Sequence, residues 1–270
     1  MVEMTKKYKI GTRRFGLINW VGAWTLYKKE VLRFLIVWIQ TIFSPLISSL
    51  LFLLVLSLAI GTERGEVLGV PFIIFLAPGL IAMQVIQQSF SHSSSSFMIG
   101  KIQGNIVDLL YAPLSATEVT ISVCLAAVTR SFMIAAISII VFYLMIDIQI
   151  KHFFTLILFT FLSSFILGNI GTIAGLWAEK FDHMASVTNF VIVPLSFLSG
   201  TFYTIDRLPG FLKTISEANP FFYMIDGFRY SFIGNADGSI KVGIIYLTIL
   251  SFLSWLATYI LFKKGYKIKS

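Results

Sequence analysis

The chain has 270 residues, of which 57% are apolar and only 13% are charged. A soluble domain carries about 25% charged residues, so this composition excludes an ordinary water-soluble fold. The charges are also clustered, because neither Asp, Glu, Lys nor Arg occurs at residues 34–62, 67–100 or 242–262. Each neutral stretch exceeds the roughly 20 apolar residues that a spanning helix needs. The sequence therefore predicts an all-α polytopic membrane protein.

The net charge of +8 does not indicate a nucleic-acid partner. The basic residues lie mostly at the chain ends and beside apolar stretches, which is typical of residues that set membrane topology. We therefore expect lipid as the surroundings and no nucleic acid as a partner.

An amphipathic segment precedes the first expected span. Aromatic and branched residues recur between Trp20 and Phe34 at spacings of three and four, which places them in one stripe on a helix. Lys28, Lys29 and Arg33 lie off that stripe. Residues 1–34 are thus expected to form a cytoplasmic N-terminus and a helix lying flat in the membrane interface. A plain aromatic anchor and a specific docking role both fit this pattern.

Six spans are expected within a transmembrane domain at residues 35–262, followed by a short tail at 263–270. The serine-rich stretch at 89–96 is expected to continue the second helix toward the cytoplasm, and Gly168, Gly171 and Gly175 predict close helix packing in the fourth span. The expected spans are residues 35–60, 70–88, 122–146, 153–177, 186–203 and 243–262.

Lys and Arg predict the orientation of these spans. With six spans both termini share one side, and that side carries most of the basic residues, so both termini are expected to be cytoplasmic. It holds Lys6, Lys7, Lys9, Arg13, Arg14, Lys28, Lys29, Arg33, Lys101, Lys180, Lys263, Lys264, Lys267 and Lys269, and the other side holds Arg64, Lys151, Arg207, Lys213, Arg229 and Lys241.

The loop between the second and third spans contains a short amphipathic segment at 105–114. It mixes Asn105 and Asp108 with Leu109 and Leu110, and Pro113 ends any helix there. A short amphipathic helix of this kind fits a groove in a soluble partner. The alternative is a helix lying on lipid.

A broken apolar segment at 208–234 precedes the last span. Asn219 and Pro220 suit a helix start, and Asp226 and Arg229 are spaced to pair on the helix that follows. Broken helices at membrane depth persist only where protein buries them or where they line a cavity. We expect a re-entrant hairpin dipping from the outer side, and two helices lying on the outer leaflet are the alternative.

Arg130 is the ionisable residue placed most clearly inside a span. It lies 12 residues after Glu118, about 18 Å along a helix and near the middle of the bilayer core. Such residues face the bundle interior or water. One interpretation has Arg130 donating to helix carbonyls, Asn169 or Asn189 to fix the packing. The other has it facing the transport path and meeting an anionic substrate group.

Signatures of catalysis and of cofactor binding are missing from the sequence. There is no GxxxxGK[ST] loop for nucleotide phosphates, no HExxH and no GxSxG turn. The three histidines fall in different loops and suggest no metal site. We therefore expect a chain that is not an enzyme, binds no cofactor, and takes energy from elsewhere if it transports. A secondary transporter or channel subunit, or an integral membrane enzyme, remains the alternative.

Several stretches, in this order and spacing, resemble the ABC-2-type transporter permeases, over nearly the whole chain from residue 29 onward. They are KEVLRF at 29–34, WIQT at 38–41, FLAPGL at 75–80, NIVDLLYAPLS at 105–115, VPLSFLSG at 193–200 and NPFFYMIDGFRY at 219–230.

The resemblance implies a bacterial inner-membrane exporter. A second permease copy, expected to be identical, would enclose a path, and two copies of a separate ATPase would bind ATP and Mg. The substrate would be a drug, a lipid or a lipid-linked glycan. The resemblance assigns contact with the ATPase to Glu30, Asn105, Asp108, Leu109, Leu110 and Pro113, and the outer gate to Asn219, Pro220, Asp226 and Arg229.

Overall fold

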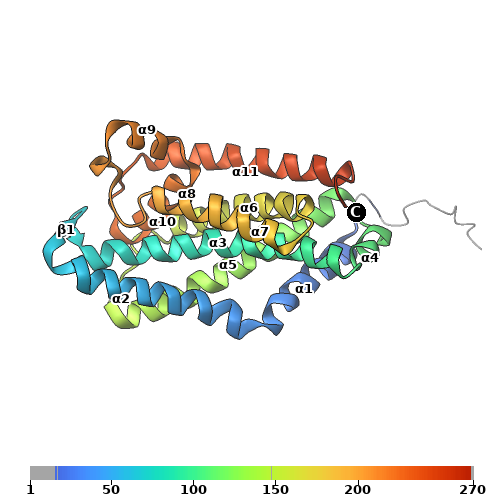
Figure 1. Cartoon of the computed structure of the whole chain (residues 1–270), viewed down its shortest axis with the longest axis horizontal. Coiled ribbons are helices and arrows are strands. Elements are labelled where there is room, and N and C mark those ends of the chain that lie inside the picture. The colour runs from blue at the N-terminus through green and yellow to red at the C-terminus, as the bar shows by residue number, and fades with distance from the viewer. Residues whose placement is uncertain (1–15, 17, 147, 269–270) are drawn as a thin grey trace, which may run out of the picture.

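A computed structural model describes residues 16, 18–146 and 148–268 of the chain. Most of its helices run along one long direction (Figure 1). One end of the bundle carries α4, the start of α1 and the C-terminus, and we call it the α4 end. The opposite end carries the β1–β2 hairpin and α9, and we call it the α9 end.

The described residues are largely helical, with one two-stranded hairpin. In chain order the elements are α1 (Trp20–Ile36), η1 (Ile39–Phe43), α2 (Ser44–Arg64), β1 (Glu66–Val67), β2 (Val70–Pro71), α3 (Phe72–Ile102), α4 (Ile106–Tyr111), α5 (Ala116–Ile146), α6 (Phe153–Trp177), α7 (Phe181–Val187), η2 (Thr188–Ile192), α8 (Val193–Leu198), η3 (Ile205–Arg207), α9 (Gly210–Ala218), α10 (Pro220–Ile233) and α11 (Ile240–Lys263).

Six helical segments among the described residues are long and apolar enough to cross a membrane, as the sequence predicts. They are Ile39–Ala59, Phe72–Ile102, Ala116–Ile146, Phe153–Trp177, Phe181–Leu198 and Ile240–Lys263.

Several helices extend beyond the expected spans. α3 runs on to Ile102, past the end of the expected span at residue 88, and so continues through the serine-rich stretch at 89–96 as the sequence predicts, because small serines fit between packed neighbours. α5 begins at Ala116, before the expected start at 122. The fifth span starts earlier and stops at Leu198, and residues 199–204 are not helical.

α3 is the central helix of the bundle and contacts α2, α5, α6 and α10 (Figure 1). Its serine-rich part is buried, and Ser89 Oγ lies 2.5 Å from Ser131 Oγ of α5. The contact with α6 depends on glycines, because a Cβ at Gly171 or Gly175 would overlap the α3 backbone. The predicted close packing of the fourth span is therefore confirmed, and α3 is its partner.

α1 meets the bundle at an angle to α2 and is joined to it through the π-helical turn η1 (Figure 1). Its buried face carries Leu26, Glu30 and Phe34. The two tryptophans of the predicted stripe point outward, since Trp20 is 73% and Trp24 64% exposed, whereas Phe34 at the other end of the stripe is buried in the bundle. This arrangement suits a helix whose indole rings lie in the membrane interface.

The close packing of α3 and α6 predicts that alanine is not tolerated at Gly171. A Cβ there would lie 2.4 Å from the Phe90 carbonyl oxygen, and backbone cannot move aside as a side chain can. Overpacking of this kind costs about 1–3 kcal/mol. We expect Gly171→Ala to lower the melting temperature of the detergent-solubilised protein.

Gly168→Ala is the matched control, because both substitutions lie in the same helix and bring the same gain in helix propensity. At Gly168 the nearest atom to the new Cβ is the Ala127 Cβ at 3.3 Å, a far milder contact. Equal melting temperatures for the two variants would contradict the close approach of α3 and α6.

Candidate functional site

α4 presents an apolar surface at the end of the bundle. Ile106 is buried against Leu26, Phe97 and Val123 and anchors the short helix. On the outer side Val107, Leu110 and Tyr111 are 46%, 37% and 85% exposed. Asn105 and Asp108 are also exposed, Leu109 is half-buried, and Pro113 follows the helix. Apart from Leu109, the residues expected at a partner surface in this loop are accessible.

Glu118 connects three segments at the α4 end. Its Oε1 accepts a hydrogen bond from the Asn19 backbone N–H at 2.6 Å, and its Oε2 accepts from the Ser115 N–H at 2.7 Å. Asn19 also donates through Nδ2 to the Pro113 carbonyl at 3.2 Å. The start of α1, the α4–α5 loop and the start of α5 are thereby held together.

The role of Glu118 was missed in the sequence, although a signal for half of it was present. Ser115 and Glu118 have the spacing of a capping box, in which the two residues bond each other's backbone N–H. The structure contains this pair, with the Glu118 N–H donating to Ser115 Oγ at 3.4 Å. The bond to Asn19 joins residues 99 positions apart, and no local pattern predicts it.

A groove of about 360 Å³ runs between α1 and α4. Its walls are mainly apolar, and Lys29 and Asp108 bring opposite charges to its lining. The apolar lining residues include Val21, Leu26, Leu109 and Leu114. An apolar groove with charged residues beside it is a suitable surface for a protein partner.

Glu30 was expected to face an ATPase, but its side chain points into the bundle and is only 3% exposed. Arg33 Nε donates to its Oε2 at 2.9 Å, and His92 Nε2 lies 3.8 Å from the same oxygen. Burial requires a carboxylate to be paired, and Arg33 supplies the pairing charge. Arg33, held by Glu30, fixes α1 against α3 through its hydrogen bonds to Ser95 Oγ and to the His92 carbonyl. Glu30 is not part of an accessible surface.

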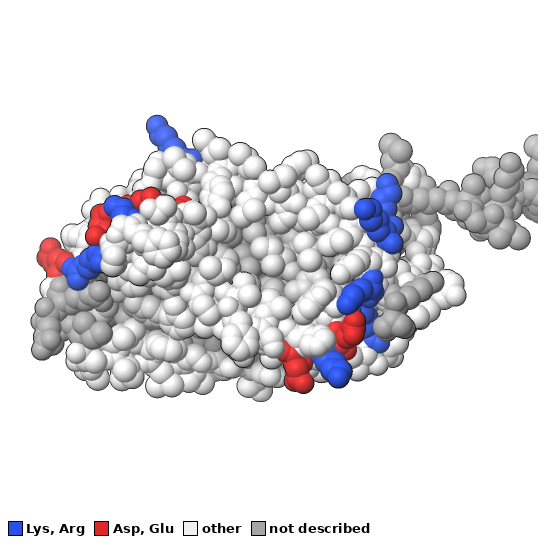
Figure 2. Space-filling view, turned by 45° about the horizontal axis from the view of Figure 1, so that its top comes forward, with Lys and Arg blue, Asp and Glu red and all other residues white. Residues whose placement is uncertain are grey.

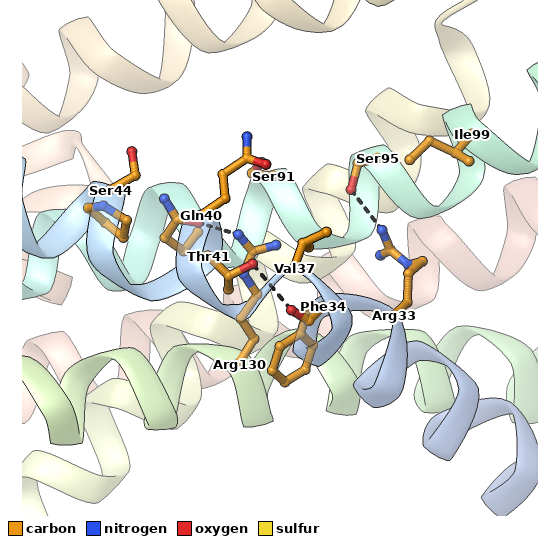
Figure 3. Close-up of a pocket in the computed structure, with 12 residues that line it drawn as sticks. Arg33, Phe34, Val37, Gln40, Thr41, Ser44, Ser91, Ser95, Ile99 and Arg130 are labelled. Atoms are coloured by element: carbon orange, nitrogen blue, oxygen red, sulfur yellow. Dashed lines mark hydrogen bonds between the residues drawn. The ribbon is translucent and has the colours of Figure 1, made fainter.

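Arg130 lines a polar cavity of about 370 Å³ between α1, η1, α2, α3 and α5 (Figure 3). Its Nη2 donates to Gln88 Oε1 of α3 at 2.5 Å. Of the two asparagines named as partners, Asn169 instead accepts from the Cys124 thiol at 3.2 Å and donates to the Phe165 carbonyl at 2.8 Å, and Asn189 makes no hydrogen bond with Arg130. Arg130 thus faces a cavity, and its partner is a glutamine.

At the α9 end, α10 lies inside the bundle and packs against α3, α6 and α11. Asn219 caps it, with Oδ1 accepting from the Phe221 N–H at 3.1 Å and Nδ2 donating to Ser199 Oγ at 2.7 Å, and Pro220 takes the first turn. α9 differs from α10, because its Phe211 is 76% exposed. The hairpin thus has one buried and one surface helix.

Asp226 and Arg229 contact different neighbours, with no ion pair of 4.0 Å or less between them. Arg229, 1% exposed, donates to the carbonyls of Phe75, Gly200 and Thr201 at 3.2, 2.8 and 3.1 Å. Asp226 accepts from the N–H groups of Asp237 and Gly238, both at 2.9 Å. The two charges fix α10 to α3 and to the loops on either side.

Asp237 belongs to the same network at the α9 end. Its Oδ2 accepts from the Ile205 N–H at 2.6 Å, and burial raises the pKa of its carboxyl group. Across the described residues, no cluster of three or more His, Cys, Asp or Glu side chains forms a metal site.

These contacts predict that removing the Arg229 guanidinium destabilises the α9 end. Arg229→Ala would remove the guanidinium donor from three carbonyls, and a buried polar group left unsatisfied costs about 1–3 kcal/mol. Asp226→Ala would free two loop N–H groups and should cost less. Melting temperatures of the purified variants would measure both effects.

Arg207→Ala is the control for loss of a positive charge at the same end, since Arg207 is exposed and makes no ion pair with a described residue. If Arg229→Ala had the same melting temperature as Arg207→Ala, the three carbonyl contacts would not stabilise the protein.

The sequence of the chain is similar to those of known transport proteins. Residues 22–233 match the model of the ABC-2 type transporter family. The chain is 30% identical over 255 residues to the inner membrane transport permease YadH of Escherichia coli strain K12, covering 94% of this chain and 99% of the relative. It is 25% identical over 251 residues to nodulation protein J of Rhizobium leguminosarum bv. trifolii, covering 88% and 92%. The chain is a membrane protein of the ABC-2 type transporter family.

Proposed function

We propose that the chain is the permease subunit of an exporter driven by a separate ATPase. One observation carries this proposal: α4 exposes apolar side chains while its other face is fixed to α1 and α5. Exposed apolar residues gathered on one element mark an interaction site. A partner that moves α4 would also move α1 and the third span, because Ile106 packs with Leu26 and Val123 and because Glu118 holds the α4–α5 loop to the start of α1.

The distribution of charged residues favours one orientation of the chain in the membrane. Figure 2 shows Lys, Arg, Asp and Glu gathered at the two ends with an uncharged band between them. We propose that the α4 end is cytoplasmic, as the excess of Lys and Arg there favours. The described basic residues at that end are Lys28, Lys29, Arg33, Lys101, Lys180, Lys263, Lys264 and Lys267, and Lys6, Lys7, Lys9, Arg13, Arg14 and Lys269 lie outside the described residues.

The proposed ATPase would supply ATP hydrolysis, for which this sequence has no GxxxxGK[ST] loop. It would bind ATP and Mg, with one ATPase beneath each of two permease copies. The exporter would reside in the bacterial inner membrane, in keeping with the name of the Escherichia coli relative. Asn105, Asp108, Leu109, Leu110 and Pro113 would form the contact, together with the groove beside α1.

A second copy of the chain would complete the path. Apolar side chains are exposed along α2 and along the fifth span, where Phe190 is 81% exposed. Lipid or a second copy can cover such a surface, and we propose that two identical copies meet there. In this arrangement α10, held by Arg229 and Asp226, would act as the outer gate. The cargo class remains a drug, a lipid or a lipid-linked glycan.

The coupling role predicts that α4 variants lose the ATPase. Leu110→Glu places a charge in the apolar surface, and Asp108→Lys reverses a charge in the groove. Loss of a central interface anchor costs about 2 kcal/mol, roughly 30-fold in Kd. We expect both variants to weaken binding of the ATPase and to abolish stimulation of ATP hydrolysis by substrate, measured on the co-purified complex.

Glu66→Lys is the matched control, since it reverses one exposed charge at the opposite end of the bundle. It should leave binding and hydrolysis unchanged. A complex carrying Asp108→Lys or Leu110→Glu that assembled and coupled normally would remove α4 from the contact.

The orientation predicts which residues an impermeant maleimide reaches in intact cells. Cys124 is buried and would first be replaced by alanine. Single cysteines would then be introduced at Ser239, exposed at the α9 end, and at Gln103, exposed at the α4 end. Only Ser239→Cys should react before the inner membrane is permeabilised. Labelling of Gln103→Cys alone would reverse the proposed topology.

A further inference from the structure

The cavity beside Arg130 combines two guanidinium groups with neutral polar side chains. Arg130 reaches from α5 to Gln88 of α3, and Arg33 reaches from α1 to Ser95, further along the same helix (Figure 3). Gln40, Gln88, Ser91 and further polar groups share the lining, which contains no acidic residue. A volume of about 370 Å³ is within the range of about 300–1,000 Å³ typical of small-molecule sites.

The positive charge of Arg130 is not compensated by the protein. Of the side chains that the structure describes, no carboxylate lies within 4.0 Å of it, whereas Arg33 is paired with Glu30. The Arg130 Nε is buried and has no hydrogen-bond partner, and Gln88 is a neutral acceptor. A guanidinium has five N–H donors, and Arg130 gives one of them to Gln88, so its terminal nitrogens keep further donors for a ligand in the cavity.

This situation differs from that of Arg229. That residue is deeper inside the protein, but three carbonyls and the face of the Phe75 ring surround its guanidinium. An unpaired charge inside a membrane protein is costly and typically marks a functional site. Arg229 has a structural explanation in its contacts, and Arg130 lacks one.

The position of the cavity indicates what kind of anion it receives. Its lining on α3 extends from Gln88 to Ile99, about 16 Å along the helix, through the half of the bundle nearer the α4 end. Phe34, Val37 and Ile99 add apolar walls, and Val37 is 49% exposed on the outer surface. A ligand with both an anionic group and an apolar part would match this lining.

We propose that the cavity binds the oxyanion headgroup of an amphiphile, a phosphate group in particular, through Arg130 and Arg33. This inference rests on the proposed export function and names the chemical class of its cargo. Guanidinium groups bind phosphate through paired N–H donors, and the serine and glutamine side chains add neutral hydrogen bonds. The headgroup enters from the leaflet at the α4 end while its chains stay beside the apolar walls.

Binding to the full chain in phosphatidylcholine nanodiscs tests the proposal. The probe is a fluorescent short-chain phosphatidic acid, compared with phosphatidylcholine bearing the same chains and label. The phosphatidic acid should bind more tightly, and Arg130→Gln should weaken it about tenfold or more, the effect of losing a charge-assisted contact. Arg130→Lys keeps the charge but lacks the paired N–H donors of the guanidinium. Its affinity for the phosphatidic acid should therefore lie between those of the unmodified protein and Arg130→Gln.

Two further variants separate the cavity from general electrostatics and from folding. Lys264→Gln removes an exposed positive charge at the α4 end outside the cavity and should leave binding unchanged. Gln40→Glu keeps both arginines but adds a carboxylate to the lining, so it should weaken binding as Arg130→Gln does. Since Arg130 has no charged partner, Arg130→Gln should melt at the temperature of the unmodified protein or higher.

Inorganic phosphate distinguishes the source of the anion. If it fails to displace the lipid probe at millimolar concentrations, the ligand is an amphiphile headgroup, as proposed. If inorganic phosphate displaces the probe fully, the site binds a soluble oxyanion, and the proposal of an amphiphile ligand is overturned. Unchanged binding in both Arg130→Gln and Gln40→Glu, or an equal loss in Lys264→Gln, overturns the anion site altogether.

The assay also separates this inference from the export proposal, because it needs no ATPase. A chain that couples to an ATPase but shows no selectivity for the phosphatidic acid refutes the headgroup site alone. A chain that binds the probe but recruits no ATPase refutes the proposed export function.

Discussion

The close approach of α3 and α6 is the contact on which the rest of the bundle depends. Glycine at 171 and 175 lets the two backbones meet, so that α3 lies at the centre with neighbours on almost every side. From there its half nearer the α9 end accepts the Arg229 contact at Phe75, and its half nearer the α4 end forms one wall of the Arg130 cavity. In a membrane, where packing drives helix association, small residues at one interface decide which helix becomes the core.

The two arginines inside this bundle show how the same side chain serves two purposes. Arg229 donates to three carbonyls, and the dipoles of these carbonyls stabilise its positive charge. Arg130 has one neutral acceptor, Gln88, and a buried Nε without a partner. Because burial of an unpaired charge is unfavourable, the second arrangement makes sense where a ligand completes it. The contrast supports a structural role at the α9 end and a binding role near the α4 end.

The segments at the α4 end are held together because they donate hydrogen bonds to one carboxylate, that of Glu118. Glu118 holds the start of α1 through Asn19 and the α4–α5 loop through Ser115. Glu30 and Arg33 then fix α1 to α3. A displacement of α4 would therefore reach the Arg130 cavity through α1, because Arg33 of α1 lines that cavity. This connection links the proposed ATPase contact with the proposed headgroup site.

The sequence by itself determined the six spans, the short helix at 106–111 and the family, since apolar length, helical periodicity and ordered motifs are local properties. Only the tertiary structure decided where the charged side chains point. The Glu30 side chain points into the bundle and pairs with Arg33, and Arg130 donates a hydrogen bond to Gln88 instead of to an asparagine. The reason is that such partners are supplied by helices distant in the chain, 42 positions apart for Arg130 and Gln88, and helix packing selects them.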